Sequence, residues 1–239
     1  MPTLPFRPAL LLLALAALGG AGCSPTSIAE ERVEEALQGA IGPADRYEVS
    51  FEGLDAGDGT ADRVTIVGER VRPAQAPALD RLDAVLEGVR FDRGESRLER
   101  AERVRADVRV RPSDLAAYVE ASGRVREATA EVRAPDVLVL RLQPDIAGLP
   151  LPSGADIEVT GTVRGDGPRL RFDVAEVRAA GLGLGGRVAD LVGAEVNPLF
   201  DLSDVGGIDL GGVEVSDVRV EDGVLVVTAE GSLAGVSFE

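Results

Sequence analysis

The sequence predicts an α+β fold in which a curved, mostly antiparallel sheet is accompanied by three helices. Two observations point to this class. Apolar and charged residues alternate along several long segments, which is typical of strands with one buried and one solvated face. Three other segments place their apolar residues at helical spacing. With 239 residues, 45% of them apolar, the chain is long enough to bury a substantial core.

The first predicted element is a helix over residues 27–41. Ser27 and Glu30 have the spacing of a capping box, and Gly42-Pro43 ends the helical pattern. The apolar residues of this segment fall on one face, and most of its acidic residues fall on the other. Because the polar face is acidic rather than basic, we expect this helix to pack on a sheet rather than on a membrane.

The predicted strands follow one another through short turns rich in glycine and aspartate. They cover residues 47–52, 63–67, 82–91, 104–110, 125–132, 137–142, 157–163, 170–177, 213–220 and 224–228. Asp222-Gly223, between two alternating segments, is the strongest hairpin signal in the chain.

Two further short helices interrupt the strands. The first is predicted at residues 113–119 with Ser113 as its N-cap, and the second covers 188–196 and ends at Asn197-Pro198. The order of strands, a short helix, more strands and another helix has the loose rhythm of a duplicated unit.

The composition excludes most common catalytic machinery. The chain contains no His, no Lys and no Trp, and its one cysteine is Cys23. Without His there is no Ser-His-Asp or Cys-His arrangement and no usual zinc site. Without Lys there is no Schiff base and no P-loop lysine. We therefore expect no enzyme activity, no metal site and no cofactor.

Two local patterns resemble functional sites only superficially, and one catalytic alternative needs no histidine. Asp55–Asp62 has Gly57 where a calcium loop needs a third-position ligand, so it is predicted to be a turn. The glycine-rich stretch 181–186 lacks a P-loop lysine and is interpreted as a flexible loop. A glycosidase needs only two carboxylates, and this alternative would require two of the 41 acids to converge in a polar cleft.

The amino terminus has the pattern of an export signal. Arg7 precedes an apolar run, Ala9–Leu18, of 10 residues, which is shorter than the roughly 20 residues that span a membrane. Cys23 follows Gly20-Ala21-Gly22, an arrangement similar to the lipobox of bacterial lipoproteins, although position 20 is usually aliphatic there. We expect a signal peptide over 1–22, a lipidated Cys23 with a short tether over 23–26, and one domain over 27–239. The alternative is ordinary signal cleavage nearby, which would leave a free thiol.

The charge of the chain limits its partners. There are 41 Asp and Glu against 25 basic residues, which gives a formal net charge of −16. This excess argues against nucleic acid and against a polybasic grip on anionic lipids. Attachment to a membrane is therefore expected to come from acyl chains on Cys23, on the extracytoplasmic side of the envelope.

Several segments, taken in order, are similar to one known family. They are 29–37 (AEERVEEAL), 59–66 (GTADRVTI), 79–89 (LDRLDAVLEGV), 113–119 (SDLAAYV) and 218–231 (VRVEDGVLVVTAEG). Together they resemble the LmeA-like phospholipid-binding proteins over residues 27–233. This resemblance implies a non-catalytic envelope protein that binds phospholipid. It also implies a tubular lipid-binding, half-barrel fold, in which the sheet wraps around the N-terminal helix and encloses an acyl-chain groove.

Two functional hypotheses remain open at this point. In the first, an anchored protein binds phospholipid acyl chains in a groove between the 27–41 helix and the inner strand faces, for envelope lipid transfer or maintenance. The residues expected to line that groove are Val33, Leu37, Phe51, Ile66, Leu86 and Leu115. In the second, a structural or adaptor lipoprotein with a filled core docks a protein partner through its acidic surface.

Overall fold

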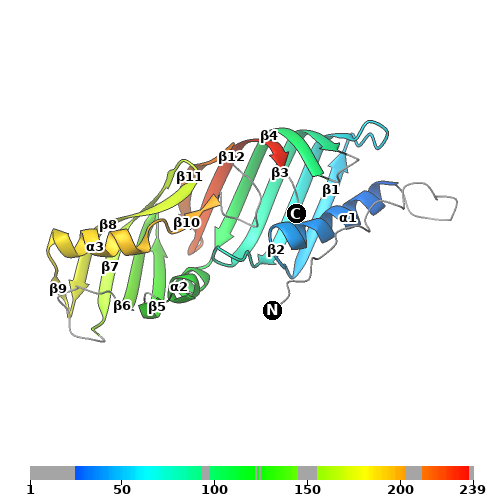
Figure 1. The fold of residues 1–239 in the computed structure, drawn as a ribbon. Helices are drawn as coiled ribbons and strands as arrows, with labels where there is room; N and C mark the ends of the chain where they lie inside the picture. Colours follow the sequence, from blue (N-terminus) through cyan, green and yellow to red (C-terminus); the bar gives the residue numbers. More distant parts are fainter. Residues whose placement is uncertain are drawn as a thin grey trace, which may run out of the picture.

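The computed structural model describes residues 25–92, 97–121, 123, 125–144, 155–202 and 212–236. Over these ranges the chain forms an elongated molecule with two sheets and three helices (Figure 1). All pairings between the described strands are antiparallel, and neither sheet closes into a barrel within this part of the chain. The predicted α+β class is therefore confirmed, with the strands divided between two sheets.

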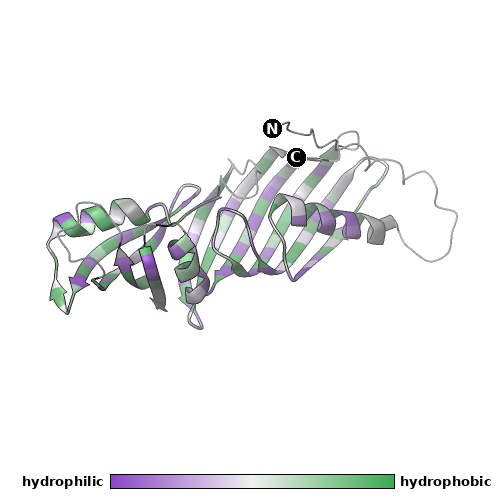
Figure 2. Cartoon of the chain, turned by 60° about the horizontal axis from the view of Figure 1, so that its bottom comes forward, coloured by the Kyte–Doolittle hydropathy of each residue, from purple (hydrophilic) through white to green (hydrophobic). Residues whose placement is uncertain are grey.

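The first sheet, sheet A, contains six long strands. Their order across the sheet is β1 (Arg46–Glu52), β2 (Thr60–Val71), β3 (Leu79–Asp92), β4 (Arg97–Val110), β12 (Val224–Val236) and β11 (Val213–Glu221). The register places apolar residues opposite one another. Ile66 pairs with Ala84, which pairs with Ala106, which pairs with Ala229. Because successive side chains of a strand point to opposite faces, these residues share one apolar face of sheet A, and the alternation of hydropathy is visible along the strands in Figure 2.

The other face of sheet A is covered by ion pairs. Glu87 accepts hydrogen bonds from Arg63 at 2.8 Å and from Arg103 at 2.7 Å, and these bonds lower the pKa of the Glu87 carboxyl. Arg105 similarly bonds Glu230 at 2.5 Å. These pairs are exposed, and such pairs contribute little to stability. We therefore assign the stability of the sheet mainly to its apolar face.

Helix α1 (Pro25–Ala40) lies across sheet A at its β1 end (Figure 1). Leu37 and Ala40 are buried there. The helix begins two residues before the predicted N-cap, Ser27, because proline is tolerated in the first helical turn. Beyond the end of the helix, the Tyr47 hydroxyl on β1 donates a hydrogen bond to the Gly42 carbonyl at 2.9 Å.

The second sheet, sheet B, follows in the chain and is flanked by the other two helices. Its elements are α2 (Pro112–Ala121), β5 (Val125–Arg133), β6 (Val137–Pro144), β7 (Ile157–Asp166), β8 (Arg169–Ala179), β9 (Leu182–Gly183), α3 (Gly186–Val196) and β10 (Phe200–Asp201). The strand order is β10-β8-β7-β6-β5, and β9 pairs with β8. Helix α2 packs against β5, and α3 packs against β8. The predicted loop at 181–186 therefore contains a short strand.

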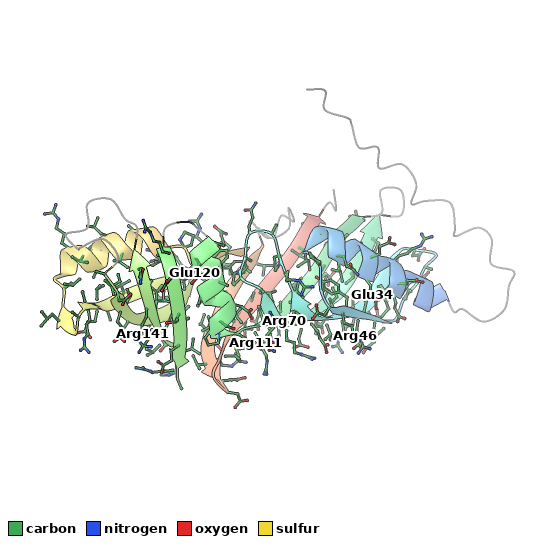
Figure 3. The ribbon with its side chains drawn as sticks, turned by 90° about the horizontal axis from the view of Figure 1, so that it is seen from below. Glu34, Arg46, Arg70, Arg111, Glu120 and Arg141 are labelled. Atoms are coloured by element: carbon green, nitrogen blue, oxygen red, sulfur yellow. The ribbon has the colours of Figure 1, made fainter. Side chains whose placement is uncertain are left out.

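The two halves of the chain share a local design. In each half, a helix is followed by four strands that pair in sequence, first α1 with β1–β4 and then α2 with β5–β8. Glu34 of α1 accepts the N–H of Val49 at 3.3 Å, and Glu120 of α2 accepts the N–H of Ala128 at 2.6 Å (Figure 3). Both acceptors meet the fourth residue of an edge strand. Each glutamate therefore satisfies a backbone donor that an edge strand would leave unpaired.

Strand β11 connects the two sheets. The Val215 N–H donates to the Gly167 carbonyl at 2.8 Å, and the Val220 N–H donates to the Pro135 carbonyl at 2.7 Å. Gly167 and Pro135 lie in turns of sheet B, whereas β11 is the outer strand of sheet A. These bonds fix the boundary at which the two sheets meet.

The buried Tyr47 hydroxyl, which bonds Gly42 just after α1, makes the stability of the fold sensitive to alkaline pH. Burial raises the pKa of its hydroxyl to about 12, whereas the unfolded chain loses this proton near pH 10. The free energy of unfolding should therefore be unaffected below pH 9 and should fall between pH 10 and 12, by up to about 2 to 3 kcal/mol. Urea unfolding across this range measures the effect. Tyr47→Phe should remove the part due to this residue, and an unchanged pH profile in that variant would contradict the assignment.

Candidate functional site

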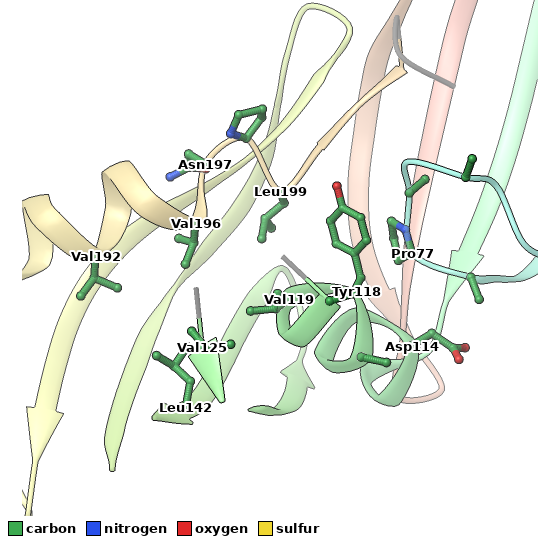
Figure 4. A pocket seen from close by; sticks show the side chains of 16 residues that line it. Pro77, Asp114, Tyr118, Val119, Val125, Leu142, Val192, Val196, Asn197 and Leu199 are labelled. Carbon is green, nitrogen blue, oxygen red and sulfur yellow. The ribbon is translucent and has the colours of Figure 1, made fainter. Parts of the chain in front are cut away.

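A pocket of about 580 Å³ lies where the two halves of the molecule meet (Figure 4). Its walls come from the connection between β2 and β3, from α2, from the start of β5 and the end of β6, and from the end of α3. The lining residues are Ala74, Ala76, Pro77, Ala78, Asp114, Ala117, Tyr118, Val119, Ala121, Val125, Leu142, Val192, Val196, Asn197, Pro198 and Leu199. The volume is in the range of pockets that hold small molecules.

The lining of this pocket is mostly aliphatic. Asp114, Tyr118 and Asn197 are its polar members among the described residues, and all three make polar contacts within the protein. The Tyr118 hydroxyl donates to the Gln75 carbonyl at 3.3 Å, which connects α2 to the opposite wall. The pocket can therefore accept an apolar group without leaving a charged side chain unpaired.

Asn197, the one asparagine of the chain, fixes the wall formed by α3. Its side-chain Nδ2 donates to the carbonyls of Phe172 and Gly193, each at 2.8 Å, and its Oδ1 accepts the Phe172 N–H at 2.7 Å. One amide therefore holds the end of α3 against β8. The third helix ends at Val196, directly before Asn197-Pro198, so its predicted end is confirmed.

A cluster of four charged residues fixes the wall formed by α2. Arg70 bonds both carboxylate oxygens of Asp114, at 2.6 and 3.0 Å, and Arg111 pairs with Asp80 (Figure 3). Arg70 has a φ of 51°, an uncommon conformation for a residue other than glycine. It lies at the end of β2, next to the connection that forms the facing wall. The bonds between Arg70 and Asp114 therefore set the position of α2 relative to that wall.

The six residues predicted to line a groove lie elsewhere. Leu37, Ile66, Leu86 and Leu115 are buried in the core, and Val33 and Phe51 are partly buried and pack against it. All six are outside the lining of the described pocket. A groove beneath α1 therefore stays a prediction. The sequence signal for the pocket was the apolar spacing of the third helix, since Val192 and Val196 belong to its wall.

Other candidate sites have plain structural roles or lie outside the described residues. The Asp55 carboxylate accepts the N–H groups of Gly57 and Asp58 at 2.8 and 3.0 Å, as expected for a turn. Cys23 and the signal segment 1–22 lie outside the described residues. Within those residues, no group of three or more Cys, Asp or Glu side chains is arranged for a metal ion, and no helix is long and apolar enough to cross a membrane.

Comparison with known families assigns the chain to one family. The sequence model of the LmeA-like phospholipid-binding family matches residues 26–230. The chain belongs to this family. No curated protein and no solved structure matches it. The resemblance noted in the sequence is thus confirmed.

The role of Asn197 in this LmeA-like protein can be tested by changing its amide to a carboxylate. Asn197→Asp replaces the two donors with an oxygen that faces two carbonyls, and we expect it to lower the free energy of unfolding by roughly 2 kcal/mol or more. Urea denaturation measures this change. Gln143→Glu is the matched control, because the hydrogen bond from the Gln143 amide to Asp156 is exposed and its loss should cost less than about 1 kcal/mol. Equal effects of the two substitutions would contradict the role of Asn197.

Proposed function

We propose that this LmeA-like protein binds phospholipid by taking an acyl chain into the pocket between α2 and α3. The observation that carries the proposal is the continuous aliphatic lining, in which the polar members already have partners within the protein. Each methylene moved from water into such a site contributes ~0.8 kcal/mol. Affinity would therefore come from the acyl chain, which is consistent with a chain whose formal net charge is −16 and which would not attract an anionic headgroup.

The proposed role is binding rather than catalysis. Asp114 is the one carboxylate in the described lining of the pocket, and it is engaged by Arg70. An acid-pair hydrolase needs a second carboxylate in the same cleft. The family is a phospholipid-binding one, which supports the same interpretation.

The proposed location is the cell envelope, with the protein attached through acyl chains on Cys23. Helix α1 begins at Pro25, so the tether between the anchor and the folded part would be short. Retained at a membrane in this way, the protein would transfer or maintain envelope lipids.

The pocket can be tested by filling it. Ala117 lies on α2 and lines the pocket, so Ala117→Trp should displace the end of an acyl chain. If about three methylenes are lost, the affinity for phospholipid should fall roughly 50-fold. Binding is measured by native mass spectrometry after incubation with phosphatidylcholine. Wild-type protein should carry a lipid, and this variant should carry little or none.

Two further variants locate the binding site. Ala36→Trp makes the same change on the exposed side of α1 and should leave binding intact. Val33→Trp would obstruct the groove predicted beneath α1. Lost binding in Val33→Trp alone would move the site to that groove, provided that thermal melting shows the variant to be folded. No lipid on wild-type protein would contradict the proposal and favour the adaptor with a filled core.

The anchor is tested separately in bacterial cells that express the full chain. Cys23→Ser should move the protein from the membrane fraction to the soluble fraction and abolish labelling by a palmitate analogue. An unlabelled wild-type protein with a free thiol would indicate ordinary signal cleavage instead.

A further inference from the structure

Two exposed leucines stand out on the surface of the described residues. Leu182 is 73% exposed and Leu191 is 39% exposed, and these are the large hydrophobic side chains that this part of the chain leaves exposed. Leu182 belongs to β9 and Leu191 to α3, which lie at one end of the elongated molecule (Figure 1). The start of α1 lies at the opposite end.

The turn just before Leu182 has the same backbone conformation as another turn of this chain but a different residue type at its first position. Ala180 and Gly181 have φ values of 50° and 78°, and Asp222 and Gly223 in the β11–β12 hairpin have 50° and 76°. Two-residue turns with positive φ at both positions favour Asn-Gly and Asp-Gly. The turn at 222–223 follows this preference, whereas the turn at 180–181 has alanine where a polar residue would be more stable. Ala180 therefore makes this turn apolar, although the backbone conformation at this position favours Asn or Asp.

This end of the molecule also differs in charge from the rest of the chain. Residues 180–191 contain one cation, Arg187, and one anion, Asp190, so the segment is neutral in a chain of net charge −16. An added Cβ would meet nothing within 4 Å at Gly181, Gly185 or Gly186, so this stretch of backbone borders open space. The charges beside β9, Glu176 and Arg178 of β8, bond each other at 2.8 Å, so a lipid surface would meet a sterically open segment without net charge here.

Helix α3 links this segment to the pocket. Leu191 is exposed on the helix, whereas its neighbour Val192 is fully buried and, with Val196, lines the pocket. The same helix therefore has an apolar residue at the surface and others in the wall of the cavity.

We propose that the leucine tip, which consists of Leu182 and the turn Ala180-Gly181, inserts into the surface of a phospholipid bilayer. Leu191 on the adjoining helix forms the flank of this contact. The tip brings the pocket to the bilayer from which lipid is taken or to which it is delivered. This use of the contact rests on the proposed function, but the insertion itself can be measured independently.

The test uses the mature chain from Ser24, which retains every helix and strand that the structure describes. Cosedimentation with phosphatidylcholine vesicles should show binding that does not depend on salt, because the contact is apolar. Leu182→Asp should weaken binding by at least about tenfold, the change expected when a leucine loses its burial. Ala180→Asp should weaken binding by a similar factor, because it places a charge in the inserted turn. Ala180→Asp should not lower the melting temperature, since Asp222 occupies the same conformation.

The control is Asp222→Ala, which makes the opposite change in the turn of the β11–β12 hairpin and should leave vesicle binding unchanged. Binding of a short-chain phosphatidylcholine below its micelle concentration is measured on the same proteins. Lost vesicle binding in Ala180→Asp with retained short-chain binding supports the tip. The proposed insertion is overturned if the wild-type protein does not bind vesicles, or if Ala180→Asp binds them as strongly as the wild type does, even when the pocket binds lipid. Self-association that Ala180→Asp abolishes, without vesicle binding, would assign the tip to a second copy of the chain.

Discussion

The structure depends on the burial of one face of each long strand in sheet A. Residues from successive strands, such as Ile66, Ala84, Ala106 and Ala229, oppose one another across the register. A slip of one residue would turn this set toward water and bring arginines and glutamates into the core. The ion pairs on the outer face, including those of Glu87, contribute little to stability, but they balance charge locally. The negative excess therefore does not prevent a closely paired sheet.

The sequence predicted the elements of this fold better than their assembly. Alternation located the strands, and Asp222-Gly223 located the last hairpin, because both signals are local. The division into two sheets depends on pairs such as Ala106 with Ala229, which are distant in sequence and have no local signal. Periodicity placed Leu37, Ile66, Leu86 and Leu115 on inner faces as groove-lining residues, and the structure buries them in the core. Periodicity does not distinguish a packed residue from one that borders a cavity. The pocket was missed because its wall combines two helices, two strand ends and a connection that lie far apart in the sequence.

The few polar groups near the pocket hold its walls in place. Asn197 holds α3 to β8, and Arg70 holds α2 through Asp114. These groups bond partners within the protein, so the described lining offers a ligand few unengaged polar side chains. This arrangement favours a rigid cavity of constant polarity, which is suited to a ligand recognised by shape and apolar area.

The placement of the pocket also determines how its volume can change over evolution. Ala74, Ala76 and Ala78 lie in the connection between β2 and β3, outside the paired strands. A larger or smaller residue at these positions alters the cavity without disturbing the register of either sheet, and connections of this kind tolerate variation. The volume of the pocket can therefore change while the scaffold of the two sheets stays the same, and under the proposed function such a change would alter the length or branching of the acyl chain that fits.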